Sequence, residues 1–336
     1  MRETVRAWVI TDGKIGDDVQ CIGVVEALGL VPDLRRVAPR RPWSWLAPRG
    51  PVDPRERPGR AGGPLAGPLP DLAIASGRRA MPHLRALSRA SGGAVFTVCL
   101  KDPRIGTRAA DLICLQSHDR LRGDNVIVTP TAPHRVSPAR LAAFRERPDP
   151  RLAPLPAPRI AVAVGGDSGH HRFTAEDEAR LLGQLRALSA QGSLMITPSR
   201  RTSPALAEGL ARLAQETQGF FYDGAGENPY VAMLALADAV VVTADSTNML
   251  GEAAASGAPV LVFTPTGGHR KIDALLAWLT EQGVARPLAG RLDGDRYPPI
   301  DATPVIAARI AQALDRHRAR RGLPALHLAG TRNGEE

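Results

Sequence analysis

Residues 237–262 read ADAVVVTADSTNMLGEAAASGAPVLV, and the fold of the whole chain can be worked out from this stretch. The apolar run 239–242 is followed by polar residues at 243–248, a segment of small residues, Gly257 and a second apolar run. This order predicts a buried strand, a polar turn, a helix that ends at the glycine, and another strand. In such a unit the turn lies at the carboxyl end of a strand and the amino end of a helix. Backbone N–H groups and the helix dipole favour an anionic ligand there.

The composition is that of a globular chain long enough for two domains. Of 336 residues, 43% are hydrophobic and 23% are charged, which is typical of a folded protein rather than a disordered one. Lys and Arg outnumber Asp and Glu by 43 to 34. This excess suits phosphates or anionic membrane surfaces, and a GC-rich genome explains it equally well. Only 4% of the residues are aromatic, and no stacking platform for nucleic acid is expected.

The expected location is the cytoplasm. No run of eighteen apolar residues predicts a transmembrane helix, and no signal-peptide pattern opens the sequence. The three cysteines, Cys21, Cys99 and Cys114, are widely spaced and lie in or next to apolar segments. They are expected to be buried thiols in a reducing compartment, without a disulfide.

The strand, loop and helix pattern recurs through the first half of the chain. Residues 5–10 lead into TDGKIGDDVQ, 71–75 into SGRR, 94–100 into KDPRIG, and 112–115 into QSHDR, and 126–128 form a further short strand. The first of these loops is neither a Walker A loop nor a GxGxxG loop. Several short buried strands that feed polar loops predict an open, largely parallel α/β sheet.

A second α/β series begins at residue 160. Strands at 160–164 and 193–197 lead into GGDSGHHRF and PSRRT, and a helix over 174–190 starts with a capping box at Thr174 and Asp177. A helix over 204–217, a short strand at 219–222 and a helix over 229–236 precede the stretch quoted first. We therefore predict an α/β fold with two Rossmann-like doubly wound domains that face each other across a cleft.

The expected boundaries follow the composition. Residues 1–150 are assigned to an N-terminal domain, 151–322 to a C-terminal domain, and 323–336 to a frayed tail, with a proline-rich linker over 137–158. Residues 38–70 are rich in proline, arginine and glycine and are expected to be an extended or mobile excursion. This segment is either a tolerated insertion or a membrane or partner contact, since aromatic and cationic neighbours suit headgroup level. The contact residues would be Arg40, Arg41, Trp43, Trp45, Leu46 and Arg49.

Four strand-end loops of the second half carry groups suited to a nucleoside diphosphate. Two glycines give backbone amides room to meet phosphate, a guanidinium can clamp a diphosphate, and a glutamate one turn into a helix can reach a ribose hydroxyl. The candidate nucleotide-binding residues are Gly165, Gly166, Asp167, Ser168, Ser199, Arg200, Arg201, Glu227, Asn228, Thr243, Asp245, Ser246, Thr247, Asn248 and Glu252.

The first half offers candidates for a catalytic base and for acceptor contacts. Asp12, Asp17 and Asp102 are the candidate bases, with His118 and Asp119 behind them. For each of these, capping a loop or pairing with Arg78, Arg79 or Arg104 is an open alternative. The candidate acceptor-contacting residues are Gly13, Lys14, Gly16, Arg78, Arg79, Lys101 and His118. No metal site is expected, because His170 and His171 lack carboxylates at ligand spacing.

The loops described above resemble motifs of two known protein families. The segment 237–262 and the GG loop are similar to the nucleotide-sugar-binding half of GT-B glycosyltransferases, especially the N-acetylglucosaminyltransferase that makes lipid II. The chain more closely resembles a bacterial member of the mitochondrial-fission elongated-mitochondria family. The matching stretches are TDGKIGDDVQ, IASGRR, KDPR, SHDR, VGGDSGHHRF, TPSRRT, GENPY and TADSTNML, spread over most of residues 8–270.

The two resemblances imply different functions. The GT-B resemblance implies a metal-independent, hexosyltransferase-like enzyme that needs no cofactor and uses a UDP- or GDP-linked sugar as donor. Its acceptor could be a lipid at the membrane surface, with the protein peripheral on the inner face. The plant member of the fission family looks like a recruiter of a dynamin-related protein, which implies the alternative of a non-catalytic adaptor that binds a protein or a membrane.

Overall fold

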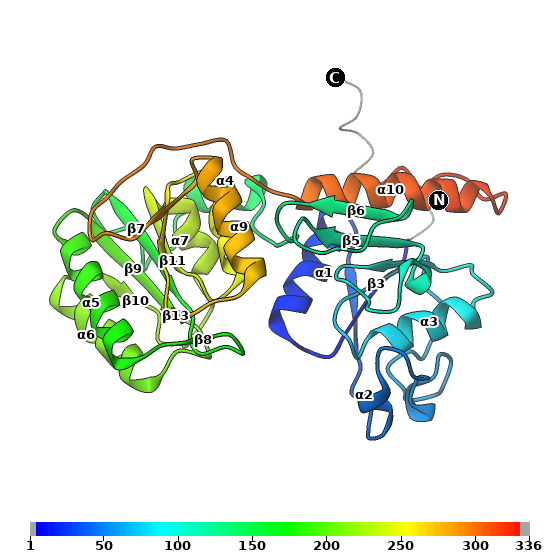
Figure 1. Ribbon diagram of the computed structural model, residues 1–336. Coiled ribbons are helices and arrows are strands. Elements are labelled where there is room, and N and C mark those ends of the chain that lie inside the picture. Colours follow the sequence, from blue (N-terminus) through cyan, green and yellow to red (C-terminus); the bar gives the residue numbers. More distant parts are fainter. Residues whose placement is uncertain (1–4, 330–336) are drawn as a thin grey trace. The chain divides into compact units, whose positions relative to one another are not determined.

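The computed structural model describes residues 5–329, which form two compact α/β units (Figure 1). Within the described residues, unit 1 comprises 5–135 and 302–329, and unit 2 is Val136–Asp301. Each unit is built on one six-stranded sheet whose strands are all parallel. The predicted α/β class with two Rossmann-like domains is confirmed. No helix between residues 5 and 329 has the length and apolar character to cross a bilayer.

The sheet of unit 1 has the strand order β2-β1-β3-β4-β5-β6. Its strands are β1 (Ala7–Thr11), β2 (Pro32–Arg36), β3 (Leu72–Ala75), β4 (Phe96–Cys99), β5 (Leu112–Gln116) and β6 (Val126–Thr129). Strand β2, with the sequence PDLRR, was not predicted, because this partly exposed edge strand has no apolar run to indicate it.

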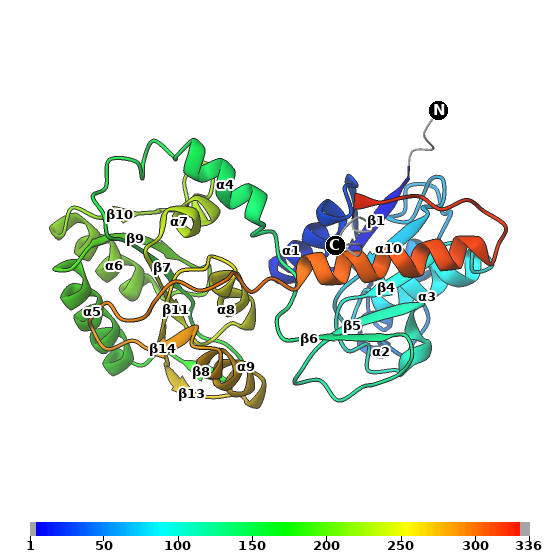
Figure 2. The same cartoon turned by 90° about the horizontal axis from the view of Figure 1, so that it is seen from above.

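Successive residues of the central strands pack on opposite faces, as the period of a strand requires. Val9 joins a cluster with α1 (Ile15–Ala27) and α10 (Thr303–Ala319), whereas Trp8 joins a cluster with α3 (Met81–Ala90). Figure 2 shows α10 lying along unit 1 beside β4 and β5. The strands are therefore buried on both faces, which explains their continuous apolar character.

The segment 38–70 is folded onto unit 1, contrary to the expected extended or mobile excursion. It contains the short helix α2 (Trp43–Leu46) and the 3₁₀ turn η1 (Pro54–Glu56). Leu65 is fully buried in the same cluster as Trp8. The buried Asp53 accepts hydrogen bonds from the Arg40 guanidinium, which holds the pKa of that carboxyl well below its usual range. The segment has no continuous apolar run. A few buried side chains and an internal ion pair stabilise its fold instead.

The sheet of unit 2 has the strand order β10-β9-β7-β11-β12-β14. Its strands are β7 (Arg159–Val164), β9 (Ser193–Pro198), β10 (Phe220–Phe221), β11 (Ala239–Thr243), β12 (Val260–Phe263) and β14 (Ala285–Pro287). A separate antiparallel pair joins β8 (His171–Arg172) to β13 (Thr266–Gly267). The segment quoted first thus forms β11, α8 (Thr247–Ala254) and β12, as predicted.

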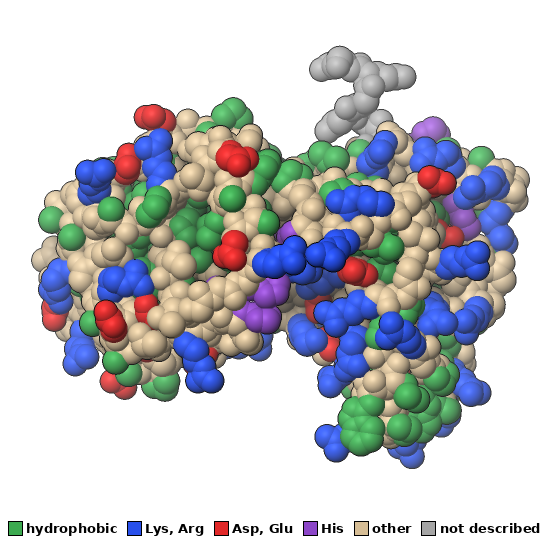
Figure 3. Space-filling view, viewed as in Figure 1, with side chains coloured by type: hydrophobic (Ala, Val, Ile, Leu, Met, Phe, Trp, Pro, Cys, Tyr) green, Lys and Arg blue, Asp and Glu red, His purple; other side chains and the backbone are tan. Residues whose placement is uncertain are grey.

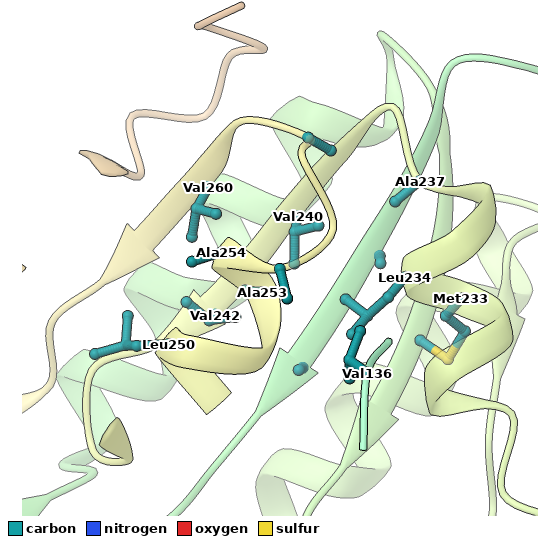
Figure 4. Close-up of a cluster of buried hydrophobic side chains, with 14 of the residues drawn as sticks. Val136, Met233, Leu234, Ala237, Val240, Val242, Leu250, Ala253, Ala254 and Val260 are labelled. Atoms are coloured by element: carbon teal, nitrogen blue, oxygen red, sulfur yellow. The ribbon is translucent and has the colours of Figure 1, made fainter. Parts of the chain in front are cut away.

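Helices cover both faces of this sheet as well. One face packs against α5 (Ala175–Ser189) and α6 (Pro204–Glu216), and the predicted capping box of α5 is present. The other face packs against α4 (Pro138–Glu146), α7 (Tyr230–Leu236), α8 and α9 (Arg270–Glu281). Figure 4 shows part of this second cluster, in which Val240 and Val242 of β11 lie near Ala253 and Ala254 of α8. Small side chains on α8 let it approach the sheet closely.

Three predicted boundaries differ from the structure. Residues 136–150, predicted as part of the first domain and the linker, belong to unit 2, where Leu141 and Leu152 are buried. Helix α10, whose residues fall within the range 151–322 assigned to the second domain, belongs to unit 1 because its apolar face packs on α1. The predicted tail also packs up to residue 329, with Leu328 buried and Leu326 hydrogen-bonded through its N–H to Asp315. Residues 330–336 of that tail lie outside the described residues.

Each sheet contains one point where the strand order reverses. In unit 1 the chain runs from β1 outward to β2 and then returns to β3 on the other side of β1. In unit 2 it runs from β7 through β9 to β10 and then returns to β11 beside β7. Ligands of doubly wound sheets bind at the carboxyl ends of the strands that flank such a reversal. The loops after β1 and β3 and those after β7 and β11 are therefore the structural candidates.

Candidate functional site at the switch point of each unit

The buried Asp245 carboxylate holds together the loops after β7, β9 and β11. Its side chain has no exposed surface. It accepts hydrogen bonds from the Thr243 hydroxyl at 2.6 Å, from the Arg201 guanidinium at 2.5 Å and from the Gly166 N–H at 3.3 Å. A buried carboxylate needs such partners to offset its desolvation. Asp245 is therefore positioned as an organiser of the loops, and its carboxylate faces the protein.

The two glycines after β7, whose amides were predicted to meet phosphate, serve the packing of the loops. The Gly165 N–H donates to Thr243 at 2.8 Å and the Gly166 N–H donates to Asp245, so protein groups occupy both donors. A Cβ at Gly165 would lie 2.1 Å from an Asp245 oxygen, and one at Gly166 would lie 1.9 Å from the Arg201 carbonyl oxygen. The glycines are needed here because neighbouring loops approach too closely for a side chain.

The loop after β9 divides its two arginines between different environments. Arg201 pairs with Asp245 and also donates to the carbonyl oxygens of Gly166 and Asp167. Thr202, which was not predicted, donates to the Gly165 carbonyl oxygen at 2.5 Å, and Ser199 contacts Thr202 within the same turn. Arg200 is exposed and forms no hydrogen bond or ion pair with any residue in 5–329. Of the two guanidiniums, Arg200 is the one that a ligand can engage.

The amino end of α8 lies at the point in unit 2 where the strand order reverses, between β7 and β11. Ser246 is the N-cap, and its hydroxyl accepts a hydrogen bond from the Met249 N–H. The first-turn N–H groups of a helix have no intrahelical partner and attract an anion. Thr247 and Asn248 belong to this first turn, and both are partly exposed. The start of α8 and Arg200 are therefore the groups of unit 2 that are best suited to an anion.

Glu252 lies one turn further along α8, beside the phenol of Tyr230 on α7. Burial raises the pKa of Glu252 to about 7, and the neighbouring Tyr230 hydroxyl lowers it by a smaller amount. Burial and the Glu252 carboxylate together raise the pKa of Tyr230 well above its usual value. Glu252 is therefore poised to gain or lose its charge near neutral pH. Tyr230 was not predicted as a site residue, although it is the last residue of the matching stretch GENPY.

The remaining predicted groups of unit 2 take part in local turns. Asp167 accepts from the Phe173 N–H, and Ser168 accepts from the N–H groups of His170 and His171. Asn228 accepts from the Tyr230 N–H at the start of α7. The backbone carbonyl of Glu227 accepts from Arg151, while its exposed carboxylate lies at the surface. The structure places these residues at the same carboxyl edge of the sheet but does not gather them around Asp245.

The loop after β1 brings two buried carboxylates into the first turn of α1. Asp17 accepts from the Ser76 hydroxyl at 2.6 Å and from the Lys101 ammonium at 2.5 Å, and thus joins the ends of β3 and β4 to α1. Asp18 accepts from the Thr11 hydroxyl and pairs with Arg36. Both carboxylates suit the positive end of the helix dipole. Since Asp17 pairs with Lys101, a structural role fits Asp17 better than the role of a catalytic base.

Asp12 differs from these neighbours. Only 3% of its side chain is exposed, and neither carboxylate oxygen has a hydrogen-bond donor among the described residues. Two cations lie near it, with Lys14 Nζ at 3.3 Å and an Arg79 guanidinium nitrogen at 3.9 Å. Gly13, with a positive φ of 84°, allows the sharp turn that places Asp12 there. A buried carboxylate that lacks hydrogen-bond donors has acceptor capacity left for a ligand.

The other predicted groups of unit 1 have local roles. Asp102 accepts from the Arg104 N–H two residues later, which is a turn-capping bond. His118 lies 3.7 Å from the Asp119 carboxylate. One nitrogen of Arg78 donates to the carbonyl oxygens of Trp45 and Ala47 and so fastens α2 to the end of β3. Gly16 lies within α1.

The site residues that were not predicted from the sequence form hydrogen bonds or ion pairs with the predicted residues, or lie beside them. Thr11, Asp18, Arg36 and Ser76 complete the unit 1 cluster, and Thr202 and Tyr230 complete that of unit 2. Several of them adjoin predicted residues in the quoted motifs, such as Asp18 after Asp17. Arg36 has no such signal, because it reaches Asp18 from the unpredicted strand β2.

The fold and these two switch points define the class of protein. Two Rossmann-like domains in one chain, with polar loops at the carboxyl ends of parallel strands, are the architecture of GT-B proteins. Two solved structures of UDP-N-acetylglucosamine 2-epimerases are similar over nearly the whole chain. The enzyme from Rickettsia bellii is 11% identical with a TM-score of 0.51, covering 95% of this chain and 97% of that one. The enzyme from Neisseria meningitidis, solved bound to UDP-GlcNAc, is 11% identical with a TM-score of 0.50, covering 97% and 96%.

The sequence identifies the family. The pattern of the mitochondrial fission ELM1 family matches residues 15–314, so the chain belongs to that family. The mitochondrial fission protein ELM1 of Arabidopsis thaliana is 29% identical over 276 residues, which are 74% of this chain. The match spans 64% of the plant protein's length, so the chain covers somewhat less than two thirds of that relative.

Proposed function

We propose that this protein is a metal-independent glycosyltransferase that binds a nucleoside diphosphate sugar in unit 2. The observation that carries the proposal is the grouping at the β7–β11 switch point. There the start of α8 and the exposed Arg200 offer donors to a diphosphate, while Glu252 lies one turn further along α8. Asp245 and Arg201 hold the surrounding loops in place. Helix amides and a guanidinium can stabilise a leaving diphosphate without a metal ion.

The donor would be recognised by two kinds of contact. The diphosphate would accept hydrogen bonds from Ser246, Thr247 and Arg200, and the ribose hydroxyls would donate to the Glu252 carboxylate. The epimerase of Neisseria meningitidis was solved with UDP-GlcNAc, which supports the choice of UDP-linked sugars as the first ligands to test. GDP-linked sugars are the second set.

Asp12 is the proposed general base. Asp12 would take the proton of an acceptor hydroxyl that is held at the carboxyl ends of β1 and β3 in unit 1. Asp12 suits this role better than Asp17 or Asp102, because no hydrogen-bond donor in residues 5–329 occupies its oxygens. A base must have a lone pair directed at the proton that it removes.

The test is calorimetric titration of the full chain with UDP- and GDP-linked sugars. Arg200→Ala and Glu252→Ala are each expected to weaken the affinity of a ligand bound by the wild type by at least about tenfold, because a charge-assisted contact is lost. Arg212→Ala and Glu208→Ala, which alter exposed charges on α6, are the matched controls and should bind normally. Equal affinity of all four variants for the ligand would overturn the assignment of the site.

The second candidate is a non-catalytic adaptor, and one observation favours it. Three groups suited to phosphate, the amides of Gly165 and Gly166 and the guanidinium of Arg201, are already engaged by the chain itself. An adaptor would keep these bonds as structural supports. A broad thermal-shift screen distinguishes the two, since a ligand that binds the folded state raises the melting temperature. No shift with any nucleotide or nucleotide sugar would favour the adaptor.

A further inference from the structure

The segment 38–70 presents apolar side chains at one end of unit 1. Trp45 is 64% exposed and Leu46 is 52% exposed, both within α2. Figure 3 shows hydrophobic side chains gathered at the end of unit 1 where Figure 1 places α2, with Lys and Arg side chains at the margin. We call Arg41, Trp45, Leu46 and Arg49 the α2 surface. Large apolar side chains that lie exposed next to each other indicate a surface that binds a partner or a membrane.

The α2 surface stands on a rigid support. Arg78 Nη1 donates to the Ala47 carbonyl oxygen at 2.7 Å, and Arg85 Nη1 lies 3.3 Å from the carbonyl oxygens of Pro48 and Arg49. The buried His83 pairs with Glu56 at 2.7 Å and fastens the other end of the segment to α3. The exposed tryptophan is thus held in place by the fold, and its position does not result from a loose loop.

The charge of the segment is arranged so that its surface is cationic. It contains two acidic residues, Asp53 and Glu56, and both are engaged internally by Arg40 and His83. Its other five arginines are all exposed, and they are Arg41, Arg49, Arg55, Arg57 and Arg60. The Arg41 guanidinium lies over the Trp45 ring at 4.9 Å from its centroid. Aromatic and apolar side chains at the tip, with guanidiniums around them, form a pattern that is complementary to a bilayer with anionic headgroups.

We propose that the α2 surface docks this protein on a bilayer that contains anionic lipids. Trp45 and Leu46 enter the interfacial region, where an indole ring is favourably placed between headgroups and acyl chains. Arg41 and Arg49 remain at headgroup level and contact lipid phosphates, as long cationic side chains do at such interfaces. The apolar insertion and the electrostatic attraction are each weak, and together they give reversible peripheral binding.

The docking has a geometric consequence within unit 1. Arg78, which holds α2, is followed directly by Arg79, which lies 3.9 Å from Asp12. The docked surface therefore adjoins the carboxyl ends of β1 and β3. If the proposed transfer takes place, this position favours an acceptor carried by the membrane, and that consequence alone rests on the proposed function. The docking itself does not depend on catalysis.

The experiment is co-sedimentation of the full chain with phosphatidylcholine vesicles that either contain or lack phosphatidylglycerol. The wild type is expected to bind the anionic vesicles, to bind the neutral vesicles at least about tenfold more weakly, and to be released by high salt because counterions screen the arginines. Trp45→Ala/Leu46→Ala is expected to lose at least about tenfold in affinity for anionic vesicles. Val31→Ala/Val305→Ala removes exposed apolar side chains elsewhere on unit 1 and is the matched control.

Three results decide the proposal. Loss of vesicle binding in Trp45→Ala/Leu46→Ala, with normal binding in the control pair and unchanged thermal unfolding of both, supports it. Equal binding of both double variants would show that charge alone drives the attachment and would overturn the insertion of α2. No binding of the wild type to anionic vesicles would also overturn it and would point to a protein partner for this surface. Calorimetry with nucleotide sugars is a separate readout, so failure of docking and failure of the proposed function are distinguishable.

Discussion

Arg201 Nη2 lies 2.5 Å from the fully buried Asp245 carboxylate, and this ion pair joins the loop after β9 to the loop after β11. We expect Arg201→Ala to lower the free energy of unfolding by about 3 kcal/mol, because it leaves a buried carboxylate without its cation. Arg200→Ala should change it by less than about 0.5 kcal/mol, since Arg200 is exposed. Urea denaturation monitored by circular dichroism measures both. A similar stability of the two variants would mean that the Arg201–Asp245 pair does not hold the loops together.

The glycines after β7 lead to a second prediction. Gly166→Ala places a Cβ 1.9 Å from the Arg201 carbonyl oxygen, so the loops must separate, and we expect a loss of at least about 2 kcal/mol in unfolding free energy. Gly169→Ala, three residues later, meets nothing within 4 Å and should be neutral within about 0.5 kcal/mol. Denaturant titration of the two variants checks this. Neutral behaviour of Gly166→Ala would show that these loops are not packed as described.

Glu252 makes stability depend on pH. Its pKa is raised from 4.5 to about 7 in the folded state, so between these values the folded chain binds more protons than the unfolded chain. The stability contributed by protonated Glu252 is therefore present below about pH 4.5 and is lost as pH rises to 7. The loss is on the order of 3 kcal/mol, from about 1.4 kcal/mol per pKa unit.

Comparison with Glu252→Gln isolates this contribution from other titrating groups. Because glutamine stays neutral, the variant should gain stability relative to the wild type as pH rises from 5 to 8, as measured by urea unfolding at each pH. Parallel pH curves for the two proteins would contradict a raised pKa at this position.

If the proposed transfer occurs, replacing Asp12 should reduce kcat much more than replacing Asp102. Asp12→Asn is expected to lower kcat by at least about 100-fold, because the amide cannot accept the acceptor's proton, while the affinity for the donor in unit 2 stays unchanged. Asp102→Asn, which alters a turn-capping carboxylate, should retain most of the activity. Steady-state kinetics with the donor identified by calorimetry checks both. Comparable losses in the two variants would argue against Asp12 as the base.

The three cysteines should be inert in the folded protein. Burial raises the pKa of the Cys99 thiol to about 12 and raises the pKa values of Cys21 and Cys114 as well. Since the thiolate is the reactive form, iodoacetamide at neutral pH should modify none of them in the native state and all three in urea. Mass spectrometry counts the adducts. Fast modification of any one without denaturant would show that its segment opens.

The composition of the segment 38–70 was a poor guide to its order. Proline, glycine and arginine predict an extended chain, because few of these side chains can form a core. The structure instead buries Leu65 and Asp53 against unit 1 and satisfies the carbonyl groups of the segment with Arg78 and Arg85. These contacts of Arg78 and Arg85 join residues that lie 31 and 37 positions apart, and no local pattern indicates them.

The sequence by itself determined the class of fold and the location of the candidate site. Apolar runs such as 239–242 can be buried only as inner strands, and the polar turns that follow them must lie at the carboxyl edge of a parallel sheet. Tertiary structure decided which polar groups remain available to a ligand. The Gly165 and Gly166 amides and Arg201 are engaged by Thr243, Asp245 and the neighbouring loops, whereas Arg200 and the oxygens of Asp12 have no such hydrogen bonds in the part of the chain that the structure describes. The sequence shows each of these groups in the same kind of loop. Whether a group is engaged by the protein or available to a ligand depends on which strands are neighbours in the sheet, and therefore on the packing of distant segments.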